Sequence, residues 1–396
     1  MSPGARPSGL KPLLTAREIV IFCGPGGVGK TTVAAAAAAR AAAELGGKVL
    51  VLTVDPARRL ADALGLQSIG NRETRVDLGD GARGELWAAM LDAEQSWDDL
   101  VRRHAPDPDT RDRILANALY RNIAGRFVQS HDYIAMERLY EVHSEGGYDL
   151  IVLDTPPSRN AIDFLEAPER MAEFFSSRFL RLLTAPYRNR LMNLAARPFH
   201  QIADRILGTQ FLSDIAEFFL LFQSMYKGFV DRAKAVSRLL RDGRTTFVVV
   251  TTLEGTPLAE AKRFMGALQE RDFHLGGLVL NRALPEWFLD HDATAEARRM
   301  ADSSEQVAGM LAETLAGSDP PAESDQEQAA RVIAEVGESF CRFSVVAQRE
   351  AEERRELADG VGTVVVVPYM ASDIADMKGL LQLSDYLVEA VPRPEA

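Results

Sequence analysis

A glycine-rich segment from Gly24 to Thr32 carries residue types that could hold a phosphate chain. Its sequence, Gly-Pro-Gly-Gly-Val-Gly-Lys-Thr-Thr, matches the pattern GxxxxGK[ST]. Glycines let the backbone wrap phosphates in conformations that side chains would block, and backbone N–H groups then point at the anion. Lys30 is expected to reach the β- and γ-phosphates, and the Thr31 hydroxyl to bind Mg²⁺. The segment therefore predicts a site for Mg-ATP or Mg-ADP. The residues expected to contact the nucleotide are Gly24, Gly26, Gly27, Val28, Gly29, Lys30, Thr31 and Thr32.

Two further segments end an apolar run in an aspartate. Leu50 to Asp55 is followed by Pro-Ala-Arg, and Leu150 to Asp154 is followed by Thr-Pro-Pro-Ser. Because ligands in open parallel sheets lie outside the carboxyl ends of the strands, both aspartates should face the glycine-rich loop. Asp154 fits the pattern in which an aspartate holds Mg²⁺, and a strand-terminal aspartate without a metal is the alternative. Asp55 could orient the attacking water or contact the metal, or it could cap the following helix.

Short apolar runs separated by helical segments predict the elements that position these motifs. Such alternation produces right-handed crossovers, and runs that are apolar throughout belong to strands covered on both faces. The fold class is therefore α/β, with a doubly wound, mostly parallel sheet. The predicted strands are Ile19–Cys23, Val49–Val54, Leu86–Leu91, Leu150–Asp154, Thr246–Thr251, Leu275–Leu280 and Thr363–Val367.

Two segments depart from this alternation. Residues 163–242 show only helical spacing of Phe, Leu and Met, which predicts a helical insert in the α/β core. Its apolar clusters fit ordinary packing, and a Met-containing groove for a hydrophobic client helix is the alternative. Residues 286–359 are polar and helical. The Pro/Gly-rich residues 1–17 predict a flexible tail, which leaves 18–396 as the ATPase domain with its insert. The residues of the insert's two clusters and its methionines are Met171, Phe174, Phe175, Phe179, Leu182, Leu183, Met192, Phe211, Leu212, Phe218, Phe219, Leu221, Phe222 and Met225.

Composition excludes several classes of function. The 396 residues carry a net charge of −12, which argues against nucleic acid and against a polybasic membrane contact. No uninterrupted apolar stretch is long enough to span a bilayer. The two cysteines predict neither a disulfide framework nor a four-ligand metal site within one chain. These features favour a cytoplasmic protein that is not integral to a membrane.

The three motifs together resemble those of the deviant-Walker-A ATPases. The similarity is greatest to the branch that contains arsenical pump-driving ATPases and the ATPases that target tail-anchored membrane proteins. The Asp-Pro-Ala that begins at Asp55 is its most specific element. The resemblance covers residues 19–165 well, resumes at three short segments further on, and is weak in the helical insert. It implies an ATP-hydrolysing switch that couples nucleotide state to the conformation of a dimer and to a partner or hydrophobic client.

The resemblance also implies roles for individual residues. Asp55 would position the hydrolytic water, and Asp154 would be the switch II aspartate. Asn281 would recognise adenine, and the loop after Pro368 would close over the ring. An amide offers both a donor and an acceptor to a base edge, but Asn281 could also be a simple turn residue at a strand end.

One departure from the family pattern affects the mechanism. The family's loop usually carries a lysine directly after its first glycine, and this lysine contacts ATP across a homodimer; here the position is Pro25. Proline has neither charge nor donor. Hydrolysis could then be slow, a Lys-bearing paralogue could supply the contact in a heterodimer, or Arg58 or Arg159 could substitute. The absence of a CxxC pair and of three clustered cysteines disfavours a zinc-bridged dimer and arsenite binding, and Cys23 is expected to be a core residue.

Overall fold

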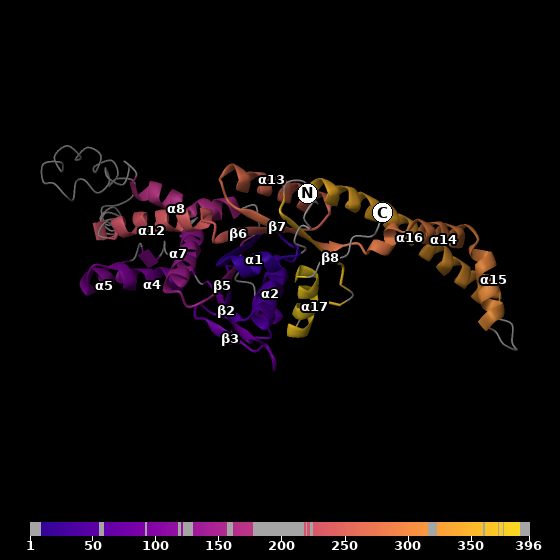
Figure 1. The fold of residues 1–396 in the computed structure, drawn as a ribbon, viewed down its shortest axis with the longest axis horizontal. Coiled ribbons are helices and arrows are strands. Elements are labelled where there is room, and N and C mark those ends of the chain that lie inside the picture. The colour runs from indigo at the N-terminus through magenta and orange to yellow at the C-terminus, as the bar shows by residue number, and fades with distance from the viewer. Residues whose placement is uncertain are drawn as a thin grey trace, which may run out of the picture.

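The structure is a computed structural model in which two groups of helices extend from a central α/β core (Figure 1). It describes residues 9–54, 59–91, 93–117, 120–121, 130–156, 161–176, 218, 220–221, 225–315, 323–358, 361–370, 372–374 and 376–388. One group of helices, within residues 93–241, lies at one end of the molecule in Figure 1, and a second group, within residues 286–358, lies at the other.

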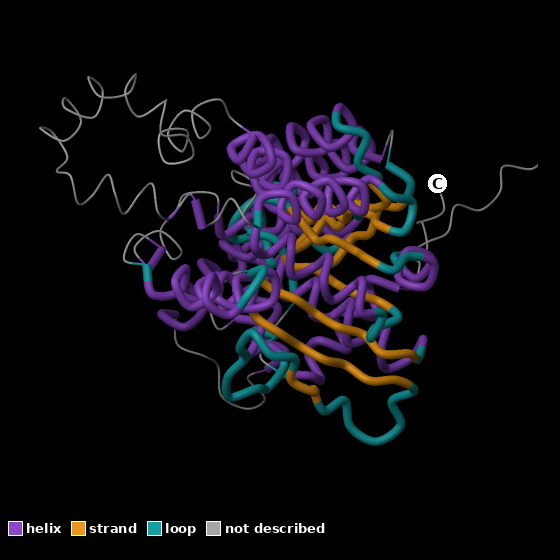
Figure 2. The backbone as a smooth tube through the Cα atoms, turned by 90° about the vertical axis from the view of Figure 1, so that its left-hand side faces the viewer, coloured by secondary structure: helices purple, strands orange, loops and turns teal. Residues whose placement is uncertain are grey.

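An eight-stranded sheet forms the centre of the core (Figure 2). The strand order is β3-β4-β2-β5-β1-β6-β7-β8, and every neighbouring pair is parallel except β3 with β4. This confirms the fold class predicted from the sequence. The strand bounds are β1 Ile19–Cys23, β2 Gly47–Thr53, β3 Thr74–Val76, β4 Gly84–Met90, β5 Leu150–Asp154, β6 Thr245–Thr251, β7 Leu275–Ala283 and β8 Thr363–Pro368.

Helices cover both faces of the sheet, as strands that are apolar on both sides require. One core contains side chains of the sheet and of α1 (Lys11–Ala16), α2 (Lys30–Arg40), α3 (Arg59–Ala63) and α17 (Met377–Val388). The alanine-rich α2 lies closely on the sheet and continues as a π-helical turn at Ala41–Leu45. The other core contains side chains of α7, α8, α12 and α13, whose bounds are Ser130–Glu145, Ala161–Ser176, Tyr226–Arg241 and Gly255–Glu270.

Two features of the core differ from the sequence prediction. The antiparallel edge strand β3 was not predicted, because its three residues are too few to show an alternating pattern. The prediction that residues 1–17 form a flexible tail is wrong for its C-terminal part, where α1 lies. Leu10 and Leu14 are buried against the sheet, and the Leu10 N–H donates to the Leu387 carbonyl oxygen at 2.7 Å. Residues 1–8 lie outside the described part of the chain.

The first group of helices has an apolar core of its own. Besides α7, α8 and α12, it includes α4 (Ala93–His104) and α5 (Pro108–Ala116). The rings of Trp97, Tyr133 and Phe229 lie at its centre, with centroids 6.0–6.2 Å apart. Of the predicted insert at 163–242, α8 and α12 are described and residues 177–217 are not. Met171, Phe218, Leu221 and Met225 are buried in this core, which agrees with ordinary packing for these four residues; Met192 and the other cluster residues lie outside the described side chains.

A buried ion pair crosses this helical core. Glu137 on α7 pairs with Arg232 on α12, and the two side chains are 7% and 17% exposed. The Tyr133 hydroxyl donates to the other Glu137 carboxylate oxygen at 2.9 Å. Burial raises the pKa of Glu137 above its usual value, while the Arg232 guanidinium opposes this rise. A charged group this deep depends on its partner to remain ionised.

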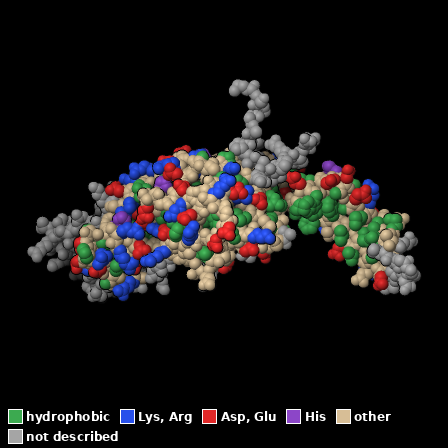
Figure 3. Space-filling view, turned by 60° about the horizontal axis from the view of Figure 1, so that its bottom comes forward, with side chains coloured by type: hydrophobic (Ala, Val, Ile, Leu, Met, Phe, Trp, Pro, Cys, Tyr) green, Lys and Arg blue, Asp and Glu red, His purple; other side chains and the backbone are tan. Residues whose placement is uncertain are grey.

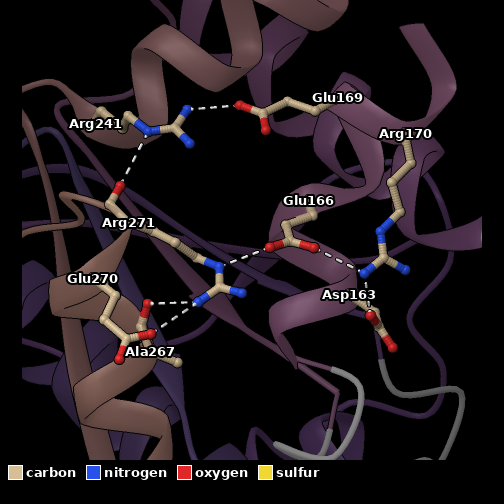
Figure 4. Close-up of polar contacts among 8 residues, drawn as sticks. All are labelled: Asp163, Glu166, Glu169, Arg170, Arg241, Ala267, Glu270 and Arg271. Carbon is tan, nitrogen blue, oxygen red and sulfur yellow. Dashed lines mark hydrogen bonds and ion pairs between the residues drawn. The ribbon is translucent and has the colours of Figure 1, made fainter. Parts of the chain in front are cut away.

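A chain of polar contacts ties α8 to α12 and α13 (Figure 4). Glu166 accepts from Arg271 at 2.7 Å and from Arg170 at 2.8 Å, so both arginines lower the pKa of this carboxyl. Arg241 pairs with Glu169 at 2.9 Å and also donates to the Arg271 carbonyl oxygen at 3.2 Å. The base of the helical group is thereby joined to the crossover helix between β6 and β7.

The second group of helices is an insertion between β7 and β8, which we name the arm. It consists of a 3₁₀ turn η2 (Glu286–Leu289), α14 (His291–Asp302), α15 (Ser304–Leu315) and the 36-residue α16 (Glu323–Ala358). The polar helical segment predicted at residues 286–359 is therefore confirmed. The arm projects away from the sheet at the end opposite α5 (Figure 1).

Candidate nucleotide-binding site

The glycine-rich loop connects the end of β1 to the start of α2. Gly24 has a φ of 145°, and a Cβ added to it would lie 2.0 Å from the Val250 carbonyl oxygen on β6, so only glycine fits. Gly29, with a φ of 86°, turns the chain into the helix. Gly26 and Gly27 are exposed, so the rim of the loop faces solvent beside the N-terminus of α2. This arrangement is suited to binding an anion.

Lys30 is the first residue of α2, and its side chain folds back over the loop. Its Nζ donates to the Pro25 carbonyl oxygen at 3.4 Å, and the side chain is buried. Val28 is also buried, while Thr32 is half-buried in the first helical turn. A positive charge is therefore held against the backbone of the loop.

Thr31 and Asp154 meet where β5 ends beside β1. The Thr31 hydroxyl donates to Asp154 Oδ2 at 2.6 Å, and the Thr53 hydroxyl at the end of β2 donates to the same oxygen at 3.0 Å. The sheet register causes this meeting, because Asp154 lies opposite Phe22 on one side and Thr53 on the other. Hydroxyl and carboxylate oxygens are the ligands that Mg²⁺ prefers, so this donor set fits the metal.

The segments that follow β2 and β5 begin beside the contact between Thr31 and Asp154. The Val54 N–H donates to the Asp154 carbonyl oxygen at 3.3 Å, and the Thr155 hydroxyl donates to the Phe22 carbonyl oxygen at 3.0 Å. Asp55 and Arg58 lie outside the described residues, as does Arg159. Their predicted roles remain predictions.

Asn281 lies at the end of β7 and contacts the loop directly. Its Nδ2 donates to the Val28 carbonyl oxygen at 2.8 Å, and its Oδ1 accepts from the Arg282 N–H at 3.0 Å. A Cβ on Gly29 would approach this Nδ2 to 2.5 Å, so glycine is needed for the contact. The structure therefore brings Asn281 to the glycine-rich loop.

Arg282 adopts an unusual backbone conformation next to it. Its φ is 57°, and the pairing of β7 with β8 shifts register between Leu280 and Ala283. This irregularity directs the guanidinium toward the loop, where it donates to the Gly27 carbonyl oxygen at 3.4 Å. Pro368 ends β8 opposite Ala283 in the register. Left-handed backbone at a non-glycine residue is costly, so it commonly marks a functional position.

Comparison with known proteins agrees with this geometry. The sequence profile of the anion-transporting ATPase family matches residues 17–311, which include the loop, both apolar strands before the aspartates, and Asn281. This chain belongs to the anion-transporting ATPase family. It is thus a P-loop ATPase by family, as the resemblance implied.

Several relatives of this ATPase are known by name. A protein of Aquifex aeolicus named as an arsenical pump-driving ATPase is 25% identical over 68% of this chain and 81% of its own length. ATPase GET3C of Arabidopsis thaliana is 26% identical over 68% of each chain. An uncharacterized Streptomyces coelicolor protein is 31% identical over 67% of this chain, which spans only 63% of that relative. The matched family region ends before α16 begins.

Two contacts of the ATPase site were not predicted from the sequence. Thr53 was not assigned a role. The sequence did carry a signal for it, because Thr53 places a hydroxyl near the end of the apolar run that precedes Asp55. Arg282 was not singled out, since no pattern in the sequence shows that an arginine takes a left-handed conformation. Both become visible only when the strand ends are placed side by side.

The buried cysteine of the ATPase agrees with a structural role. Cys23 is buried in the core, as predicted, and burial raises the pKa of its thiol far above the usual value. It therefore stays protonated, a poor state for binding a soft metal. Within the described residues, no group of three His, Cys, Asp or Glu side chains is placed to hold a metal ion, and no helix is long and apolar enough to cross a membrane.

Proposed function

We propose that this ATPase binds and hydrolyses Mg-ATP at the glycine-rich loop. The contact of the Thr31 hydroxyl with Asp154 at 2.6 Å carries this proposal, because it unites two of the three predicted metal ligands. Lys30 would hold the β- and γ-phosphates, and the loop residues Gly26–Thr32, which follow Pro25, would donate their N–H groups to them. Asp55 would position the attacking water and contribute to the metal shell. Asn281 and Pro368 would flank the adenine.

Mg²⁺, when bound, would neutralise charge on the phosphate oxygens. Thr31 and Asp154 would hold it, directly or through water, and Thr53 would fix the orientation of the Asp154 carboxylate. The Asp154 side chain is almost fully buried, so its charge acts in a site of low dielectric. Positioning and electrostatic stabilisation supply the rate enhancement, and no covalent intermediate is needed.

We further propose that the ATPase works as a cytoplasmic dimer whose conformation follows its nucleotide and is coupled to a partner or hydrophobic client. A homodimer and a heterodimer with a Lys-bearing paralogue are the two forms considered. Pro25 favours a second candidate function, that of a nucleotide-binding subunit with little turnover of its own. It is buried beneath Lys30 and offers only its carbonyl oxygen to the site. Turnover of ATP by the purified chain, with Asp55→Asn as the blank, decides between the two.

Arg282 is proposed to provide the cation that Pro25 lacks. Its guanidinium already lies at the exposed rim of the loop, beside Gly27, where a phosphate oxygen could replace the carbonyl. A charge-assisted hydrogen bond of this kind contributes about 1.5–3 kcal/mol. Replacing Arg282 by alanine should therefore raise the Kd for ATP about tenfold or more.

The matched control for this prediction is Arg299→Ala, which removes an exposed arginine on α14. It should leave the affinity unchanged, and Arg282→Lys should restore much of it. Titration with a fluorescent ATP analogue gives both constants. An unchanged Kd for Arg282→Ala would rule out the phosphate contact.

A further inference from the structure

The arm exposes an unusual amount of apolar surface. Of the nine large hydrophobic side chains that are exposed in the described part of the chain, eight lie on it. Figure 3 shows hydrophobic side chains gathered on the arm, whereas charged and neutral side chains dominate the core surface in the same view. Contiguous exposed apolar surface on a protein usually marks an interaction site. The eight residues are Trp287, Met310, Leu311, Val332, Val336, Phe343, Val345 and Val346.

Four of these side chains form a regular seam along α16. Val332, Val336, Phe343 and Val346, with Ser339 between the second and third, succeed one another at alternating steps of four and three residues. That spacing is the heptad pattern of a helix that pairs with another helix. The four are 47–55% exposed, so the described part of the arm leaves them largely uncovered.

A different face of α16 packs within the arm. Gly337 lies against α14, where a Cβ would come within 2.4 Å of the Ala297 carbonyl oxygen, and Ser344 and Ala347 are buried on the same side. The Ser344 hydroxyl lies 3.0 Å from that of Thr294 on α14. Of the seam, the Phe343 ring also packs on Phe288 of η2, with centroids 5.4 Å apart, but the Phe343 side chain stays 48% exposed. The described part of the arm therefore packs mainly on one side of α16 and leaves most of the seam accessible.

We propose that the seam pairs with the same seam of a second copy of this chain, with the two α16 helices antiparallel. One register places Val336 opposite the partner's Val346 and Phe343 opposite the partner's Ser339, so that the large ring meets the small side chain. The midpoint of α16 lies between Phe340 and Cys341, at the centre of this register. The paired seams then run from Val332 to Val346, a length of about 21 Å.

Charge supports this partner and this orientation. Glu335 borders the seam and faces the partner's Arg349, and the two-fold symmetry forms this pair twice. Arg342 meets its own copy at the centre, where Glu338 of the same helix, 3.4 Å away, offsets the charge. A parallel pair would set Phe343 against the partner's Phe343 and would leave Glu335 facing apolar side chains. The seam is thus complementary to itself only when antiparallel.

Sedimentation velocity of the full chain without nucleotide tests the pairing. Val336→Glu buries a charge in the seam and should weaken dimer formation about tenfold or more. Val345→Glu is the matched control, because Val345 is exposed on the same helix but lies off the seam. It should leave association unchanged. A chain that stays monomeric at all concentrations, or an equal loss for both variants, overturns the proposal; the seam would then suit another protein's helix.

A charge exchange tests the orientation. Glu335→Arg should weaken the dimer, and the double variant Glu335→Arg with Arg349→Glu should restore it, since both symmetric pairs re-form. In a Cys341→Ser background, a mixture of Val336→Cys and Val346→Cys chains should form mixed disulfides. Disulfides only between identical Val336→Cys chains, or a double variant as weak as the single one, would exclude antiparallel pairing. None of these results depends on ATP hydrolysis.

Discussion

Replacing Asp154 by asparagine is expected to lower the turnover of ATP by about two orders of magnitude, the usual effect of removing one preorganised electrostatic group. The carboxylate accepts hydrogen bonds from Thr31 and Thr53 through one oxygen and holds the negative charge that a metal at Thr31 needs. Asparagine has nearly the same shape but no charge. A steady-state ATPase assay at saturating Mg²⁺ measures the change.

The matched control is Asp149→Asn, one residue before the same strand. Asp149 accepts from the Lys48 N–H at 2.7 Å at the opposite end of β5, far from the loop. Its replacement should leave turnover intact. Equal activity of Asp154→Asn and the wild type would show that Asp154 does not serve the metal.

Replacing Arg232 by methionine is expected to destabilise the protein by about 3–5 kcal/mol at pH 8, because it leaves the buried Glu137 carboxylate without its ion-pair partner. The loss of the guanidinium should raise the pKa of Glu137 further above its usual value. Glu137 then remains charged, at a cost to folding, only above that raised pKa. The difference in stability from the wild type should therefore shrink as the pH falls toward 5.

Urea denaturation at the two pH values measures this effect. Arg238→Met on the same helix is the matched control, since Arg238 is exposed. Adding Glu137→Gln to Arg232→Met should recover much of the stability at pH 8. A loss that is the same at both pH values would mean that packing, and not the charge of Glu137, accounts for the effect.

The sequence predicts the sheet well because its central strands are apolar on both faces. The residues of β1, β5 and β6 are buried throughout, and such runs cannot be mistaken for loops. The short strand β3 and the helix α1 were not predicted, for two different reasons. Three residues of β3 carry too little pattern, and the Pro/Gly content around α1 hides two leucines whose burial depends on contacts with α17.

That the loop and Asp154 lie together was predictable, because both follow strands whose carboxyl ends meet at one edge of the sheet. Thr53 and Arg282 were not, since their roles arise from the sheet register and from a left-handed residue at a strand end. The arm shows a third limit. The sequence predicted a polar, helical segment, but the valine and phenylalanine seam became evident only once the structure showed which side of α16 faces α14.

The central claim is that this ATPase hydrolyses ATP as a dimer despite Pro25, and the specific rate as a function of protein concentration tests it most directly. Asp55→Asn at each concentration provides the blank, and Val336→Glu separates association through the arm from association at the nucleotide site. The account predicts a specific rate that climbs with concentration and then levels off. A flat, near-zero rate with intact ATP binding would contradict it and favour the second candidate, a nucleotide-binding subunit with little turnover of its own.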